Sequence, residues 1–299
     1  VWSLLASQAA YECWHLVEIF FERRGTPLDL RSLPVMLAQL IQALYNIVDS
    51  FFVGKYSETG LTALSIIYPV QLLMIALGVG TGVGINTDMA YYLGIGKKKK
   101  AEEVAGTGTP LGLILWIIFA AVCYVTLPAY AGMSTDSPEV IRDVVAYGRI
   151  VCLFSIGLFT EGIWSKILQA EGDMRTPMIA QIAGAVVNII LDPLLIFGML
   201  GMPEMGISGA AVATVSGQIV AALIVMKKAW YRSPRRSCYP GHIKRIYQLG
   251  IPNIIMQSAY TLYILGLNLI LAGFSDQAVT ALGLYYKWQT FFFIPLGAL

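Results

Sequence analysis

Residues 33–54 read LPVMLAQLIQALYNIVDSFFVG, and this stretch decides how the rest of the chain is interpreted. It has about the length that a helix needs to cross a bilayer. Four polar residues recur through it three or four positions apart, which places them on one face of a helix: Gln39, Gln42, Asn46 and Asp49. An ionisable group at membrane depth is costly, so Asp49 marks a candidate ion or substrate path.

The composition of the chain favours an integral membrane protein. Of its 299 residues, 57% are hydrophobic and only 13% are charged, and the mean hydropathy is +0.68. Soluble domains carry about 25% charged residues. A soluble amphipathic helix with its polar face in water is therefore the weaker interpretation of residues 33–54. The net charge of +2 gives no reason to expect a nucleic-acid partner.

Eight apolar stretches, separated by short polar turns, predict an all-α protein with eight spans. We expect these spans at 33–54, 60–94, 107–131, 139–168, 176–200, 207–229, 243–273 and from about 277 onward. The second is too long for one straight crossing, and glycines at 78, 80, 82 and 84 are expected to interrupt it or to admit another backbone. Residues 1–32 are expected to be an amphipathic or disordered segment.

Basic residues predict the orientation, because Lys and Arg collect in cytoplasmic loops. Thirteen of them fall in or beside the loops after spans two, four and six, against two in the alternate loops. We therefore expect a cytoplasmic N-terminus.

An internal repeat joins the first and seventh spans. Shifting the chain by 218 positions gives ten identities between residues 34–71 and their counterparts, among them Pro34 with Pro252 and Thr62 with Thr280. The shift covers six spans, so both copies enter the membrane in the same direction, as in two-lobed transporters. We expect a first lobe at 33–230, a cytoplasmic loop between the lobes at 231–242, and the start of a second lobe at 243–299.

Polar residues also converge in spans five and six. Gln181, Asn188 and Asp192 share one helical face, and Pro193 follows at once and favours a kink. Span six adds Thr214 and Gln218, one turn apart, and span seven adds Gln257. Carboxylate, amide and hydroxyl oxygens suit a proton or a small hard cation such as Na⁺. Glu161 and Glu171, near the end of span four, are weaker candidates.

Enzyme motifs and metal-ligand patterns are missing from the sequence. The four cysteines and two histidines are scattered, so we expect no disulfide framework and no zinc site. The glycines of GVGTGVG lie in a membrane span, without the strand and helix that a dinucleotide loop needs. We expect no enzyme activity and no cofactor besides the coupling ion.

Three stretches together resemble the multidrug and toxic compound extrusion (MATE) family: QALYNIVDSFFVG at 42–54, AEGDMRTPMIAQIAGAVVNIILDPLLIFG at 170–198, and GISGAAVATVSGQ at 206–218. The resemblance implies twelve helices in two six-helix lobes, in the plasma membrane of a prokaryote. It also implies export of organic, often cationic compounds against inward flow of H⁺ or Na⁺, by a monomer.

By motif match, the resemblance assigns ion coupling to Asp49, Asn188, Asp192 and Thr214, and a place in the first-lobe cavity to Gln42 and Tyr45. The polar stripes add Asn46, Gln181, Gln218 and Gln257 to the expected substrate cavity, and Pro34 and Pro193 are expected hinges. Span seven carries Gln257 and Ser258 where NorM-like members have an acid, so the chain resembles the DinF-like or MepA-like branch. It is expected to be a fragment, one lobe and the first two helices of the next.

Two other functions stay open at this point. A flippase for lipid-linked saccharides should line its cavity with Arg or Lys, and the polar stripes of spans one, five, six and seven carry none. A membrane scaffold without transport is the other alternative. The paired intramembrane carboxylates and the repeat favour the exporter over both.

Overall fold

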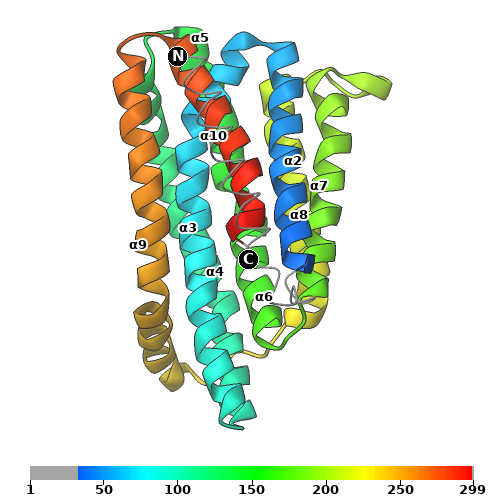
Figure 1. Cartoon of the computed structure of the whole chain (residues 1–299), viewed down its shortest axis with the longest axis vertical. Helices are drawn as coiled ribbons and strands as arrows, with labels where there is room; N and C mark the ends of the chain where they lie inside the picture. Colours follow the sequence, from blue (N-terminus) through cyan, green and yellow to red (C-terminus); the bar gives the residue numbers. More distant parts are fainter. Residues whose placement is uncertain (1–32, 298–299) are drawn as a thin grey trace, which may run out of the picture.

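A computed structural model describes residues 33–297, and every regular element in this range is helical. The helices are α2 (Leu33–Tyr56), α3 (Glu58–Gly94), α4 (Lys98–Ser134), α5 (Pro138–Leu153), α6 (Ile156–Ala170), α7 (Arg175–Ile196), α8 (Ile207–Ala229), α9 (Tyr239–Ala272) and α10 (Asp276–Gly297), with short 3₁₀ turns at Met199–Gly201 and Arg236–Cys238. They run side by side in an elongated bundle (Figure 1). The expected all-α fold is confirmed, and the expectation for residues 1–32 lies outside the described residues.

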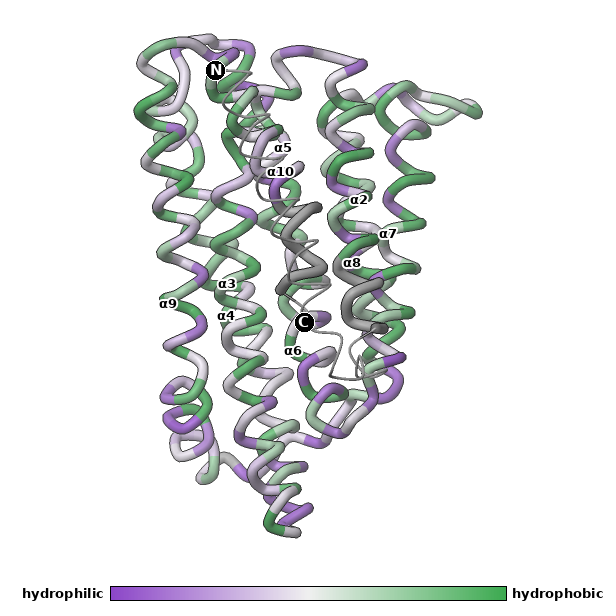
Figure 2. Tube along the Cα trace, in the orientation of Figure 1, coloured by the Kyte–Doolittle hydropathy of each residue, from purple (hydrophilic) through white to green (hydrophobic). Residues whose placement is uncertain are grey.

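Five of the described helices are long and apolar enough to cross a membrane, namely α3, α4, α7, α8 and α9, and the bent pair of α5 and α6 makes a sixth. Helix α2, with 24 residues, and α10, with 22, correspond to the first and last expected spans. Hydrophilic residues gather at the lower end of the bundle (Figure 2). This distribution agrees with a bundle whose sides face lipid.

The long second span is one continuous helix, which corrects the expectation of an interruption. Helix α3 runs unbroken for 37 residues, including its glycines. These glycines instead admit neighbouring backbones: a side chain at Gly84 would collide with the carbonyl oxygen of Ile246, and one at Gly250 would lie 2.6 Å from the carbonyl oxygen of Gly80. Helices α3 and α9 therefore pack backbone to backbone at this seam.

The fourth span, expected as one helix, is broken into α5 and α6 with a bend of 45°. Two carbonyl groups at the break find partners outside the helical ladder. Ser155 Oγ donates to Cys152 O at 2.7 Å, and Trp116 Nε1 of α4 donates to Leu153 O at 2.9 Å. Because these bonds satisfy freed carbonyls, the bend does not leave them unpaired.

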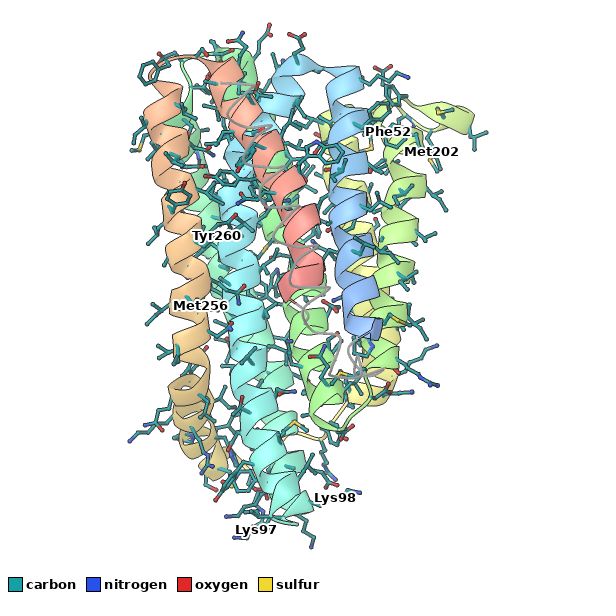
Figure 3. The ribbon with its side chains drawn as sticks, viewed as in Figure 1. Phe52, Lys97, Lys98, Met202, Met256 and Tyr260 are labelled. Carbon is teal, nitrogen blue, oxygen red and sulfur yellow. The ribbon has the colours of Figure 1, made fainter. Side chains whose placement is uncertain are left out.

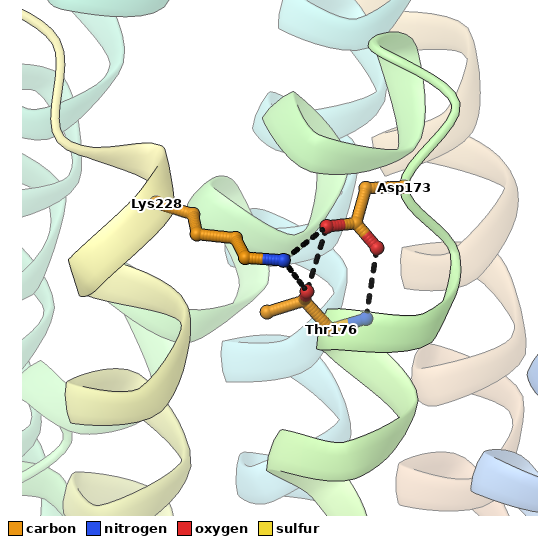
Figure 4. Close-up of polar contacts among 3 residues, drawn as sticks. All are labelled: Asp173, Thr176 and Lys228. Atoms are coloured by element: carbon orange, nitrogen blue, oxygen red, sulfur yellow. Dashed lines mark hydrogen bonds and ion pairs between the residues drawn. The ribbon is translucent and has the colours of Figure 1, made fainter.

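The loops that follow α3, α6 and α8 meet at one end of the bundle, where Lys97 and Lys98 lie (Figure 3). Asp173, in the loop after α6, contacts the last turn of α8, since its carboxylate caps Thr176 and accepts from Lys228 Nζ at 3.0 Å (Figure 4). Partial desolvation raises the pKa of Asp173, but the bonds from Thr176 and Lys228 outweigh it and lower that pKa to about 2.

Helix α9 is tied to this same end by a buried acid. Arg245 Nε lies 2.5 Å from Oδ1 of Asp88, a residue of α3 with no exposed surface. The Arg245 guanidinium also lies over the rings of Tyr91 and Tyr92, 4.7 Å and 5.1 Å from their centroids. The first expected lobe and the start of the second are thus joined where the basic loops gather.

The internal repeat has counterparts in local geometry. Ser57 Oγ accepts from Gly60 N–H and Ser275 Oγ accepts from Ala278 N–H, each at 3.2 Å, so the two turns are capped alike. Thr62 and Thr280, which stand 218 positions apart, meet through their hydroxyl groups at 2.7 Å. Equivalent residues of the two copies therefore contact each other, as at a two-fold axis.

Candidate functional site

The core of the site is set by close packing of α7 against α8. A side chain at Gly184 would lie 2.7 Å from the carbonyl oxygen of Gly217, and one at Gly217 would lie 2.5 Å from that of Gly184. Small residues let two membrane helices approach until their backbones touch. This seam places Asn188 of α7 opposite Thr214 of α8.

Three of the predicted ion-coupling residues meet at this seam. Asn188 Nδ2 lies 3.3 Å from Thr214 Oγ1 and 3.5 Å from Asp192 Oδ1, and Asp192 is one turn further along α7. With its amide turned over, Asn188 donates to Asp192 Oδ2 at 3.2 Å and accepts from the Thr214 N–H at 3.1 Å. All three are buried, and Asp192 has no exposed surface. The cluster is a set of oxygen and amide groups enclosed by helices.

Asp49 approaches this cluster from α2, which packs against α7. Its side chain is 4% exposed, and Oδ1 has no hydrogen-bond partner among the described residues. Asp49 and Asp192 lie within range of mutual electrostatic influence, although no hydrogen bond joins them. The Tyr45 hydroxyl is under the influence of both. The structure therefore brings the fourth predicted residue to the site without direct contact.

Other predicted cavity residues lie around this centre. Asn46 Nδ2 donates to the carbonyl oxygen of Gln42 on its own helix at 2.9 Å. Gln181 is hydrogen-bonded to Glu161 of α6, which also accepts from Ser165 Oγ at 2.7 Å. Gln218 Oε1 is buried on α8 with no partner among the described residues. Glu161 thus has one partner on its own helix and one on α7.

Of the two expected hinges, Pro193 adjoins the cluster and Pro34 stands at the start of α2, whereas Gln257 belongs to another helix. Pro34 is the second residue of α2, and Pro193 stands near the end of α7, directly after Asp192. Gln257 lies on α9, where its amide donates to Asn253 Oδ1 at 2.5 Å. It helps to line a groove of about 240 Å³ between α3 and α9, with Leu72, Ile75, Met256, Tyr260 and Thr261. Gln257 therefore belongs to a different cavity.

Sequence reasoning missed one charged residue of the site. Lys287 of α10 is only 8% exposed, donates a hydrogen bond to Ser50 Oγ on α2, and interacts electrostatically with Asp49. The polar stripes considered above stopped at span seven. A lone lysine between aromatic residues in the last apolar run, YYKWQTFFF, was the available signal.

The donor set of the site fits a proton or a small hard cation. Carboxylate, amide and hydroxyl oxygens are hard ligands, and the unpartnered Asp49 Oδ1 can accept either ion. Among residues 33–297, no group of three His, Cys, Asp or Glu side chains is placed to hold a metal ion.

Comparison with known proteins assigns the family. The MatE family profile matches residues 34–194, more than half of the chain, including Asp49, Asn188 and Asp192. The chain belongs to the MatE family. Other MatE proteins cover most of its length: the probable multidrug resistance protein NorM of Thermotoga maritima is 28% identical over 87% of this chain, and the multidrug export protein MepA of Staphylococcus aureus is 27% identical over 87%.

A solved MATE structure agrees with the fold as well. DinF-BH, a MATE multidrug transporter determined in complex with a bound ligand, is 26% identical and superposes with a TM-score of 0.82 over 93% of this chain and 64% of its own. The chain spans 58% of the length of NorM and of MepA. This MatE chain is thus a multi-pass membrane protein whose relatives include multidrug transporters.

Proposed function

We propose that the whole protein carrying this chain is a secondary active antiporter that exports small organic cations in exchange for H⁺ or Na⁺. The observation that carries this proposal is the buried cluster of Asn188, Asp192 and Thr214 with Asp49 in electrostatic range. Burying two ionised carboxylates in a membrane bundle has a high free-energy cost unless an ion or a proton neutralises them. Multidrug transporters among the relatives support the same function.

The physical logic is competition for negative charge. With both carboxylates ionised, the first lobe attracts cations, including a cationic substrate. Entry of H⁺ or Na⁺ removes net negative charge and weakens that attraction. An ion shifts a conformational equilibrium only if it binds the two states with different affinity. Pro193, directly after Asp192, has no backbone N–H to donate to the preceding turn of α7. The helix can therefore bend at this point when an ion binds.

The groove between α3 and α9 suits the substrate better than the ion. Met256 and Tyr260 line it together with Gln257, and both labelled side chains project from α9 (Figure 3). Apolar and aromatic walls with a few polar groups are typical of sites for organic molecules, and Tyr faces attract organic cations. We propose that the protein acts as a monomer in the plasma membrane of a prokaryote, with a cytoplasmic N-terminus.

Dye efflux from everted vesicles tests the proposal. Vesicles holding the whole protein are given a proton or sodium gradient, and accumulation of a fluorescent cation is followed. Asp49→Asn and Asp192→Asn keep the shape and remove the charge, so each should abolish gradient-driven transport while membrane insertion is retained. Asp136→Asn, an exposed acid in the loop before α5, is the matched control and should transport normally. Undiminished coupling in both site variants would place the ion site elsewhere.

The flippase alternative receives no support from the groove, because Arg and Lys are absent from the residues that line it. A lipid-linked saccharide carries a pyrophosphate that needs such cations. Transfer of a lipid-linked saccharide in the same vesicles, without dye transport, would reverse this preference. A scaffold without transport would give neither signal.

A further inference from the structure

Lys287 is a buried cation contributed to the site by the second expected lobe. Helix α10 packs against α2 and α3, and this contact carries the Lys287 ammonium to Ser50, the residue next to Asp49. Only 8% of Lys287 and 4% of Ser50 is exposed. A lysine is almost never buried to this extent without a partner for its charge.

The Ser50 hydroxyl is oriented to accept a hydrogen bond from this ammonium. Ser50 Oγ donates its own proton to Asn46 O at 2.9 Å, which leaves its lone pairs to accept from Lys287. Lys287 has two further N–H donors, and the carboxylate that acts on it electrostatically is Asp49. The serine therefore anchors the ammonium close to the acid.

A count of charges shows what this cation does. The titratable side chains within electrostatic reach of one another at the site are Asp49 and Tyr45 (α2), Asp192 (α7), Glu161 (α6) and Tyr147 (α5). Glu161 has Lys166 as its own electrostatic partner. Two ionised aspartates and one ammonium leave a net charge of −1 (−2 + 1).

We propose that Lys287 is a positioning residue of the ion site, a built-in counter-charge to Asp49 that leaves the two aspartates one monovalent cation short of neutrality. The inference rests on the proposed function. Because the ammonium belongs to α10 and its partners to α2, an ion that neutralises Asp49 also weakens the attraction between these helices. By linkage, separating the helices strengthens ion binding. The second lobe thus senses the ion through Lys287.

The test is a pH titration of protonated carboxyl groups by infrared spectroscopy on the purified whole protein, with H⁺ as the probe. Lys287→Met and Lys287→Gln remove the positive charge, so the buried carboxyl signal should persist to a pH higher by about one unit. Lys287→Arg keeps the charge and should titrate near the wild-type midpoint. Asp49→Asn identifies the band.

Two outcomes would overturn the proposal: an unchanged midpoint in both neutral variants, or an equal shift in Lys287→Arg, which would indicate disturbed packing rather than lost charge. The vesicle assay tests the proposed function separately, because wild-type vesicles would show no gradient-driven efflux if that function were wrong. The infrared midpoint would still decide the role of Lys287. In vesicles that do transport, the pH optimum of efflux should rise in Lys287→Met and stay in Lys287→Arg.

Discussion

The turn from α2 into α3 and the turn from α9 into α10 have the same capping geometry, but they differ in charge. Shifted by 218 positions, Ser57 and Thr62 fall on Ser275 and Thr280, with the same caps and the same back-bonds to the preceding turn. Asp49, in contrast, falls on Leu267. The shared residues shape the backbone, and the proposed ion coupling rests on a residue that the second copy lacks.

The two interfaces between these copies differ in the same way. Where α10 meets α2, Lys287 bonds to Ser50. In the related contact of α9 with α3, Asn268, the counterpart of Ser50, donates to the carbonyl oxygen of Ser65 at 3.3 Å. At this pair of positions one interface holds a buried lysine and the other only neutral groups, and the ion pair of α9 with α3, Arg245 with Asp88, lies elsewhere in that contact.

The largest effect is expected from moving the charge to the other copy. Asp49→Asn should lower gradient-driven efflux by at least about tenfold, since ion-dependent stabilisation of about 1.4 kcal/mol or more is lost. Adding Leu267→Asp should not restore it, because Leu267 is not accompanied by the Asn188 and Thr214 cluster. Vesicle efflux measures both, with Leu267→Asn as the control for a polar group at this position. Recovery in the double variant would show that either copy can hold the coupling charge.

A smaller effect is expected where equivalent residues touch. Gly283 is the counterpart of Ser65, and a side chain at Gly283 would collide with Ser65 Oγ. Gly283→Ala should therefore destabilise the protein by about 1–3 kcal/mol through overpacking. The exchange Ser65→Gly with Gly283→Ser should recover most of this loss, since a two-fold axis makes the two arrangements equivalent. Thermal melting in detergent checks this, and an exchange as harmful as Gly283→Ala would contradict the axis.

The two serine caps are expected to contribute about equally. Ser57→Ala and Ser275→Ala each remove one hydroxyl acceptor from a helix N-terminus, at a cost of about 1 kcal/mol. The threonine variants keep the hydroxyl and are the controls. Unequal losses in thermal melting, with one cap neutral, would mean that only one copy depends on its turn.

The smallest effect is expected at the hydroxyl pair of Thr62 and Thr280. A double-mutant cycle with Thr62→Val and Thr280→Val should give a coupling of about 0.6 kcal/mol, the usual value for hydrogen bonds between membrane helices. Thr87→Val, which removes an exposed hydroxyl that bonds within its own helix, supplies the uncoupled control. A coupling of zero would mean that the two hydroxyls meet without stabilising the contact.

The sequence was sufficient to predict the helices, the repeat and the Asn188–Asp192–Thr214 cluster, because periodicity and spacing along one or two helices carry that information. It could not predict the break after Leu153, since one carbonyl there is satisfied by Trp116, 37 positions away. Nor could it choose between the two roles of the α3 glycines, because their partners Ile246 and Gly250 lie on a distant helix.

The place of Lys287 depended on long-range packing as well. Its charge within an apolar run was visible, but the contact with Ser50 joins residues 237 positions apart. For a related reason, the position of Glu161 near a helix end gave no sign of its interaction with the Gln181 side chain of α7. Spacing along a single helix does not indicate which side chains of other helices a residue contacts.

The contact of Thr62 with Thr280 has the form of a homodimer interface enclosed within one chain. At the axis of a symmetric dimer each residue meets its own copy, and the patch is complementary to itself. Two identical lobes could close by the same contact, but the two related interfaces would then carry the same charges. Joining unlike copies in one polypeptide makes it possible for one interface to hold an acid and a lysine while the related positions, Leu267 and Pro69, are uncharged.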